Sequence, residues 1–299
     1  MKPAPFVHHV PRTLDEAIAM LADVADQDGR ILAGGQSLVP AMALRLARPA
    51  HLVDINAVPE LAGLATRDGA LVVGACVRHA AFHEPVEPGP LGALLADVVR
   101  HIAHWPIRTR GTMGGSLANA DPASEWCLVA ETLGAEVELV SLRGGRRLGA
   151  SDFNRGTMET ALAADELLAF VHLPLLPEGT RFGFCEVSRR AGDYAQAMAL
   201  VVFEQTDGIM RNLRVGVGAV EGKPRRIAEV EAVLEGAPPD PELFRRAGAV
   251  AAAHIAPAEL DEDVAAYKRH LAGVVVERAL VRAIAGDKAA AEPASAEPR

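Results

Sequence analysis

The chain has 299 residues, of which 50% are hydrophobic and 23% are charged, a globular composition with enough material for two domains. Its formal net charge of −9 and its pI near 5.6 argue against a nucleic-acid surface, which needs clustered Lys and Arg. An anionic ligand would therefore have to be held by backbone N–H groups and a few local arginines.

The three cysteines, Cys76, Cys127 and Cys185, are far apart in the sequence and form no C-x-x-C pair. This spacing encodes neither a zinc ribbon nor an iron–sulfur cluster, and no metal site is expected. An odd number of cysteines without a disulfide framework suits a reducing compartment. Residues 1–21 lack the continuous apolar region of a signal peptide, and no run approaches the ~18 apolar residues of a membrane span. We expect a soluble, cytoplasmic protein.

The first elements alternate between helix and strand. Thr13 and Glu16 form a capping-box pattern that predicts a helix of roughly three turns. A buried strand is expected over 29–35, ending in glycines, followed by a helix over 37–47 and a strand over 51–56. A further strand is predicted over 69–77 and a helix over 92–104.

The next elements are predicted as a helix over 123–133, a hairpin over 135–150 turning at Gly144-Gly145, and a strand over 165–175 closed by Pro174. Turn residues cluster at 177–179 and indicate a domain boundary. Three strands follow over 181–190, 195–204 and 209–219, and then helices, the last over 263–285. The tail, residues 288–299, has the composition of a disordered segment.

Two glycine loops are the most informative motifs of the chain: "AGGQSLVP" at 33–40 and "TMGGSLANADP" at 112–122. Consecutive glycines let the backbone approach a ligand closely, and a following helix points N–H groups at the same spot, which suits a phosphate. Two such loops suggest a pyrophosphate gripped from both sides. Glycine pairs also occur as tight turns without a ligand, and these residues alone leave both explanations open. The sequence has no G-x-G-x-x-G after a strand and no P-loop.

Three longer segments carry a family resemblance: "AGGQSLVPAMALRLARPAHLVDIN", "IRTRGTMGGSLANADPASE" and "RRAGDYAQAMALVV". They resemble, in order and spacing, the signature segments of the FAD-binding medium subunit of molybdenum hydroxylases. That family includes the middle subunits of carbon monoxide and nicotine dehydrogenases and the flavin domain of xanthine dehydrogenase. The resemblance extends over residues 5–285.

The resemblance implies an α+β fold in two domains. Residues 1–177 would form a two-subdomain FAD-binding domain of the vanillyl-alcohol-oxidase (PCMH) type, with subdomains of about 1–57 and 58–177. Residues 178–287 would form a C-terminal flavoprotein domain, a three-stranded antiparallel sheet with helices.

The resemblance also implies the site residues. Cofactor-binding positions are expected in both loops: Ala33, Gly34, Gly35, Gln36, Ser37, Thr112, Met113, Gly114, Gly115, Ser116, Asn119 and Asp121. A valine at Gly114 would then occupy the space of the phosphate and abolish FAD retention. Tyr194 is expected as the catalytic residue, beside the isoalloxazine ring. Glu186 and Arg189 are weaker candidates. Arg108 and Arg110 could either meet the ligand or brace the loop through salt bridges.

The implied function is electron transfer. FAD would accept electrons from 2Fe-2S clusters of a small subunit, which drain a molybdenum cofactor in a large subunit, and would pass them to an external acceptor. The resemblance implies a dimer of such heterotrimers. Two alternatives stay open: a stand-alone FAD-dependent oxidoreductase of the same fold, and a non-catalytic assembly protein. His101 and His104 have metal-ligand spacing on a predicted helix, but no third ligand is evident, and we interpret them as structural.

Overall fold

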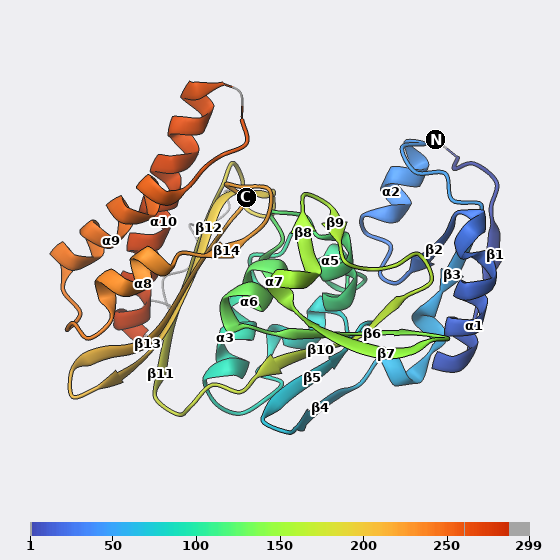
Figure 1. Cartoon of the computed structure of the whole chain (residues 1–299), viewed down its shortest axis with the longest axis horizontal. Helices are drawn as coiled ribbons and strands as arrows, with labels where there is room; N and C mark the ends of the chain where they lie inside the picture. The colour runs from blue at the N-terminus through green and yellow to red at the C-terminus, as the bar shows by residue number, and fades with distance from the viewer. Residues whose placement is uncertain (1, 260, 287–299) are drawn as a thin grey trace, which may run out of the picture.

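The computed structural model describes residues 2–259 and 261–286, which form three larger sheets, a small two-stranded sheet and the helices that pack on them (Figure 1). The first sheet holds three parallel strands in the order β1-β3-β2. Its elements are β1 (Val7–His9), α1 (Leu14–Val24), β2 (Gly29–Leu32), α2 (Leu38–Ala43) and β3 (His51–Asp54). The predicted cap is confirmed, because the Thr13 hydroxyl accepts a hydrogen bond from the Glu16 N–H at 3.2 Å. Strand β1 was not predicted.

The second sheet is antiparallel, in the order β4-β5-β10-β6-β7. Its strands are β4 (Leu64–Arg67), β5 (Ala70–Gly74), β6 (Glu136–Ser141), β7 (Gly144–Gly149) and β10 (Leu167–Pro174). The accompanying elements are α3 (Pro90–Val98), α4 (Trp105–Arg108), α5 (Met113–Asn119), α6 (Glu125–Leu133), α7 (Ala150–Phe153) and the small hairpin of β8 (Asn154–Gly156) and β9 (Glu159–Thr160). The predicted helix over 92–104 is thus shorter, and a separate α4 follows it.

The predicted turn of the β6–β7 hairpin was wrong by two residues. Ser141 pairs with Gly144, so Leu142 and Arg143 form the turn, and the two glycines begin β7. Gly144 is still needed for the turn, because its φ of 109° lies in a region that other residues avoid.

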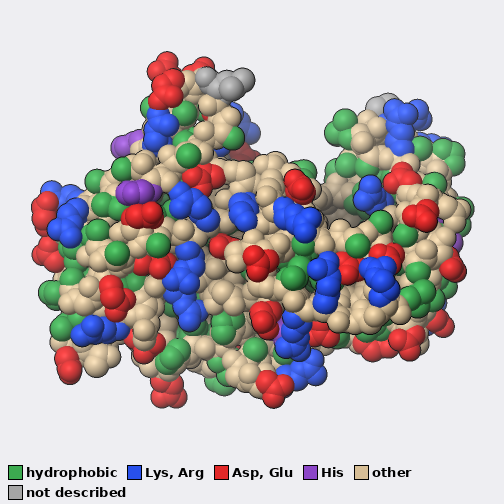
Figure 2. All heavy atoms as spheres, in the orientation of Figure 1, with side chains coloured by type: hydrophobic (Ala, Val, Ile, Leu, Met, Phe, Trp, Pro, Cys, Tyr) green, Lys and Arg blue, Asp and Glu red, His purple; other side chains and the backbone are tan. Residues whose placement is uncertain are grey.

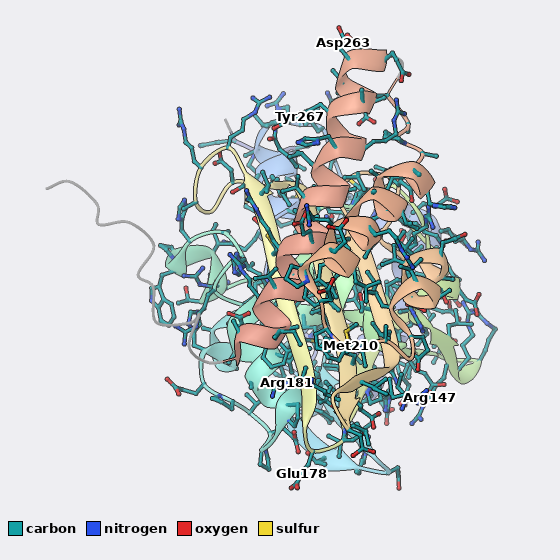
Figure 3. The ribbon with its side chains drawn as sticks, turned by 90° about the vertical axis from the view of Figure 1, so that its left-hand side faces the viewer. Arg147, Glu178, Arg181, Met210, Asp263 and Tyr267 are labelled. Carbon is teal, nitrogen blue, oxygen red and sulfur yellow. The ribbon has the colours of Figure 1, made fainter. Side chains whose placement is uncertain are left out.

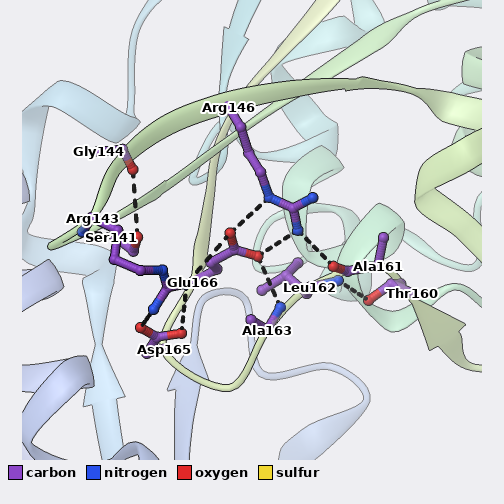
Figure 4. Close-up of polar contacts among 10 residues, drawn as sticks. All are labelled: Ser141, Arg143, Gly144, Arg146, Thr160, Ala161, Leu162, Ala163, Asp165 and Glu166. Carbon is purple, nitrogen blue, oxygen red and sulfur yellow. Dashed lines mark hydrogen bonds and ion pairs between the residues drawn. The ribbon is translucent and has the colours of Figure 1, made fainter.

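Ion pairs fasten β7 to the segment that enters β10 (Figure 4). Arg146 donates from Nε and Nη2 to the two carboxylate oxygens of Glu166, each at 2.7 Å. Glu166 is only 6% exposed, and it also accepts from the Ala163 N–H at 2.9 Å. The Arg146 bond lowers the pKa of Glu166, so the buried carboxylate stays ionised and paired. Arg143 pairs with Asp165 beside it.

The third sheet is antiparallel and forms the C-terminal part with three helices. Its elements are β11 (Thr180–Ser188), β12 (Ala195–Thr206), β13 (Ile209–Gly218), β14 (Arg225–Arg226), α8 (Ala228–Leu234), α9 (Pro241–His254) and α10 (Glu262–Ala285). The three predicted strands are present, and the two-residue β14 adds a fourth. The helices cover one face of the sheet (Figure 3), and α3 and α6 pack on the other face.

Burial on both faces explains the apolar run of β12. Met198, Leu200 and Val202 belong to the core shared with the second sheet, and Ala197, Ala199 and Val201 belong to the core under the helices. Because successive side chains of a strand point to opposite faces, a strand between two layers is apolar at every position. The C-terminal sheet is therefore sandwiched between its own helices and the preceding part of the chain.

The cysteines lie in separate buried regions and are free thiols. Cys76 belongs to the core of the first sheet and Cys185 to the core under the C-terminal helices. Cys127 lies on α6. Burial raises the pKa of Cys76 to about 11 and that of Cys127 to about 12, and it also raises the pKa of Cys185.

The face in Figure 2 carries acidic and basic side chains interspersed with one another. Across residues 2–259 and 261–286, no helix is both long and apolar enough to cross a membrane. The segment predicted to be disordered, 288–299, lies outside the described residues.

Candidate functional site

The first glycine loop connects β2 to α2. Gly35 has a φ of 75°, which a glycine adopts without strain, and Gly34 is buried. The carbonyls of Gly35 and Ser37 accept from the N–H groups of Val39 and Ala41 at 3.0 and 3.2 Å. Within the described residues, the N–H groups of residues 34–37 have no acceptor from the protein itself. Unpaired donors that converge on a glycine loop suit an anionic ligand.

The second glycine loop leads into α5 and is held by its own hydrogen bonds. Thr112 is the N-cap, and its hydroxyl, on a residue only 2% exposed, accepts from the Gly115 N–H at 3.0 Å. A Cβ on Gly115 would lie 2.7 Å from that hydroxyl oxygen. Met113 is 1% exposed and packs in the core, so it can offer a ligand only its backbone. Thr112 and Gly115 thus fix the shape of the loop.

Gly114 lies against Ala75, a close approach that the sequence analysis did not predict. A Cβ at this position would lie 2.6 Å from the Cα and 2.7 Å from the Cβ of Ala75, directly after β5. The missing side chain therefore lets α5 approach the residue that follows β5.

The structure brings the two loops into contact. A Cβ on Gly34 would lie 2.4 Å from the carbonyl oxygen of Arg110 and 2.7 Å from the Cα of Gly111. A Cβ on Gly115 would lie 3.9 Å from the Cβ of Ala33. Two segments almost eighty residues apart in the sequence therefore lie against each other at this point.

Two residues that the sequence analysis did not select connect the loops. Asn56 donates from Nδ2 to the Ala33 carbonyl at 2.8 Å, and Arg78 donates from Nη2 to Asn56 Oδ1 at 2.6 Å. Arg78 Nη1 donates in addition to the Arg110 carbonyl. The signal for Asn56 was its place at the end of a strand beside a glycine loop. Arg78 carried no such signal.

Arg108 and Arg110 have separate roles. Arg108 Nη1 donates to the carbonyls of Arg100, Ile102 and Ala103 at 3.3, 2.8 and 3.0 Å, so it braces the α3–α4 connection through carbonyls and not through salt bridges. Arg110 is exposed, and its charge lies close enough to lower the pKa of Arg78, after the larger effect of burial.

The end of the second motif makes a tight bend. Asn119 is the last residue of α5, and Ala120 follows with a φ of 49°. Asp121 Oδ1 then accepts from the Ala123 N–H at 2.9 Å. Trp126 lies in the buried core beyond, where its Nε1 donates to His79 Nδ1 at 2.9 Å.

Tyr194 lies in the connection between β11 and β12 and is 73% exposed. It borders an open hollow of about 420 Å³ with Arg189, Gly192, Asp193 and Gln196. The pKa of Tyr194 is raised, by partial burial first and then by the charges of Asp121 and Glu125. Tyr194 therefore shares its electrostatic environment with the end of the second motif.

Two part-buried carboxyl groups, one before and one after residue 177, lie near enough for the charge of one to act on the other. Glu186 is on β11, on the side of Phe184, and Glu125 is the first residue of α6. Burial raises the pKa of Glu186 to about 8, helped by the charge of Glu125. Burial likewise raises the pKa of Glu125 to about 7, and the charge of Asp121 adds to it. Glu186 Oε2 has no hydrogen-bond partner within the described residues.

His101 and His104, the two histidines with metal-ligand spacing, pack against neighbouring residues. His101 contacts the Phe184 ring edge-on at a centroid distance of 4.8 Å, and burial lowers its pKa to about 4. The His104 ring lies 2.4 Å from the position of a Cβ on Gly192. Across the described part of the chain, no cluster of three or more His, Cys, Asp or Glu side chains is placed to hold a metal ion.

Comparison with known proteins gives matches along nearly the whole chain. Residues 4–176 match the FAD binding domain in molybdopterin dehydrogenase, and residues 182–283 match the CO dehydrogenase flavoprotein C-terminal domain. The chain is 37% identical over 273 residues to the nicotine 6-hydroxylase medium subunit of Paenarthrobacter nicotinovorans, covering 91% of this chain and 95% of that protein. It is 35% identical over 289 residues to the carbon monoxide dehydrogenase medium chain of Afipia carboxidovorans, covering 96% and 100%.

Solved structures agree with these matches. The quinoline 2-oxidoreductase structure from Pseudomonas putida 86 has a chain with a TM-score of 0.87 and 36% identity, covering 95% of this chain and 98% of that one. A carbon monoxide dehydrogenase structure from Hydrogenophaga pseudoflava gives a TM-score of 0.89 and 34% identity, covering 95% and 99%.

Proposed function

Because the chain belongs to the family of FAD-binding medium subunits of molybdenum hydroxylases, we propose that it carries electrons from the 2Fe-2S clusters of a partner subunit, through FAD, to an external acceptor. The chain is an oxidoreductase subunit with FAD as its cofactor. The observation that carries the proposal is the contact of the two glycine loops at Gly34 and Arg110, which makes one cradle from two distant segments.

The loops would hold the pyrophosphate of FAD. Residues 34–37 offer backbone N–H groups that the protein does not use, and Ser37 and Ser116 add hydroxyls from the two sides. Ala33, Gln36, Thr112 and Met113 complete the loops, with Thr112 acting as the helix cap. Asn119 and Asp121 stand at the end of α5, where ribose or ribityl hydroxyls could be bound.

Tyr194 would lie beside the flavin ring. Its exposed side chain borders the hollow and shares an environment with Asp121, which supports this position. When bound, FAD supplies the redox chemistry, accepting electrons from clusters and releasing them to an acceptor. An aromatic side chain there would stack on the ring and exclude water from one face.

The finer architecture is proposed on the same basis. We place the FAD-binding domain at 1–177 and assign it to the vanillyl-alcohol-oxidase type, with subdomains of about 1–57 and 58–177. The parallel sheet falls within the first range and the five-stranded sheet within the second, which supports the division. The C-terminal domain is placed at 178–287.

The partners would be a large subunit with the molybdenum cofactor and a small subunit with the 2Fe-2S clusters, in a dimer of heterotrimers in the cytoplasm. Relatives are named as the medium or alpha subunit of such complexes, which supports a multi-subunit assembly. The isolated chain should therefore bind FAD and yet oxidise no substrate of the complex.

A visible absorption spectrum of the purified chain tests this function, with the released cofactor identified by chromatography. FAD at about one per chain is the expected result. FMN would mean that the second loop binds something other than a pyrophosphate. A colourless chain that also fails to bind added FAD would favour an assembly protein. Turnover of a substrate with a dye acceptor by the isolated chain would favour a stand-alone oxidoreductase.

A further inference from the structure

Arg78 lies at the point where the two glycine loops touch. It follows β5, and its backbone forms a bridge with Thr112, the cap of the second loop. Its side chain reaches the opposite way, to Asn56 Oδ1 at 2.6 Å, and Asn56 holds the Ala33 carbonyl at 2.8 Å. One guanidinium thus connects the second loop to the first.

The same guanidinium also binds the Arg110 carbonyl. This is the oxygen that lies 2.4 Å from the position of a Cβ on Gly34. A planar guanidinium can hold two acceptors in fixed directions, which a lysine cannot do. Arg78 therefore joins the two segments through hydrogen bonds within the protein itself.

Two arginines and one carboxylate act on one another at this point. Arg78 donates to two neutral acceptors, and the charge of Arg110 acts on it from the second loop. The carboxylate of Asp54 also acts on Arg78 and offsets part of this positive charge. Two like charges close together are stabilised when an anion binds beside them. In a protein with a net charge of −9, this pair of arginines is a favourable place for an anion to bind.

We propose that Arg78 and Asn56 form a clasp that sets the spacing of the two loops before the cofactor arrives, and that Arg78 and Arg110 together favour its pyrophosphate. Arg78 is in this sense a positioning residue. The inference rests on the proposed function, and it adds two residues that neither loop motif contains.

The test uses the full-length chain, freed of flavin, and four variants: Arg78→Met, Arg78→Lys, Asn56→Ala and, as control, Arg147→Met. Arg147 is a half-exposed arginine of β7 that pairs with Glu138 away from the loops.

Flavin fluorescence gives the Kd of FAD for each protein at low and high salt. Competition by ADP, which carries the pyrophosphate, is compared with competition by riboflavin, which carries no phosphate. Amide hydrogen exchange of residues 33–37 and 110–112 is measured without ligand.

Arg78→Met should raise the Kd of FAD and of ADP at least tenfold and leave that of riboflavin within twofold. The effect on FAD should shrink at high salt, because part of it is electrostatic. Arg78→Lys should recover part of the affinity, since it restores the charge but not both hydrogen bonds. Asn56→Ala should speed exchange at 33–37, and Arg147→Met should match the wild type.

Unchanged FAD affinity and unchanged exchange in both Arg78 variants would overturn the clasp, and so would an equal loss of riboflavin and ADP binding, which indicates general damage. Should Arg78→Met not fold, Arg78→Lys and Asn56→Ala decide by the same criteria. A wild type that binds no FAD would refute the proposed function, whereas the exchange data would still report on the clasp.

Discussion

Gly34 and Gly114 lack side chains for two different reasons. Gly34 lets one loop lie against the backbone of the other, and Gly114 lets a helix approach a strand. The sequence analysis interpreted both glycines as points of close approach to a ligand. A glycine pair in a sequence does not show which part of the protein or ligand lies close to it. The cradle of the loops could be predicted from the motifs. Arg78 could not, because contacts between side chains 22 residues apart leave no local pattern, and the only signal for Asn56 was its place at the end of a predicted strand.

Replacing Gly34 by alanine should push the loops apart, because the new Cβ would meet the Arg110 carbonyl at 2.4 Å. We expect the Kd of FAD to rise at least tenfold, measured by flavin fluorescence. Gly63→Ala is the matched control, since nothing lies within 4 Å of its Cβ position, and it should bind FAD like the wild type. Equal affinity of the two variants would refute the contact between the loops.

Replacing Gly114 by valine should destabilise the chain even without cofactor, because the side chain would clash with Ala75. Overpacking of this kind costs typically about 1–3 kcal/mol and occasionally more. Thermal unfolding of the flavin-free variant should therefore begin several degrees lower. If FAD binding were lost while the unfolding temperature stayed the same, the side chain would be entering the ligand space after all.

At the scale of elements, segments with a clear sequence pattern were predictable, down to the four-residue β2 and β3, and the shortest strands were not. The apolar runs of β10 to β13 and the capped α1 have clear periodicity, whereas β1 has three residues and β14 has two, too few to show any. These short strands form only because a longer partner, β3 or β13, provides hydrogen bonds. The proximity of Glu125 on α6 and Glu186 on β11 could not be predicted either, since the two residues lie far apart in the sequence.

That carboxyl pair makes stability depend on pH. Glu125 and Glu186 have pKa values of about 7 and about 8 in the folded chain, above the ordinary 4.5. The folded state therefore binds more protons than the unfolded state between about pH 5 and pH 8, and the free energy of unfolding falls as the pH rises through this range.

Glu186→Gln mimics the protonated group and should remove part of this loss. We expect the flavin-free variant to match the wild type in unfolding temperature at pH 5 and to exceed it by a few degrees at pH 8.5. Other titrating groups are common to both proteins and cancel in the difference. Identical pH dependence in the two proteins would show that Glu186 is ionised in the fold.

At the scale of the molecule, a ligand held between two segments couples them. Both glycine loops belong to the part of the chain before 177, and Tyr194 belongs to the part after it. A cofactor that contacts all three would stabilise the whole chain, because it binds the folded state and not the unfolded one.

FAD at one hundred times its Kd should therefore add about 2.7 kcal/mol to the free energy of unfolding. In a thermal scan this appears as a rise of several degrees that grows with the FAD concentration. ADP should give a smaller rise, since it reaches only the loops. A rise confined to one of two separate unfolding steps would mean that the cofactor contacts a single domain.

The three buried thiols can report the local opening of the chain in these unfolding experiments. Cys76 and Cys185 lie in the cores of the first and third sheets, and Cys127 lies on the helix between the second motif and the C-terminal sheet. A thiol reagent attacks the thiolate, which burial suppresses, so labelling must wait until the surrounding region opens. With one cysteine in each region, mass spectrometry of labelled peptides can time the opening of each separately, without introducing a single probe.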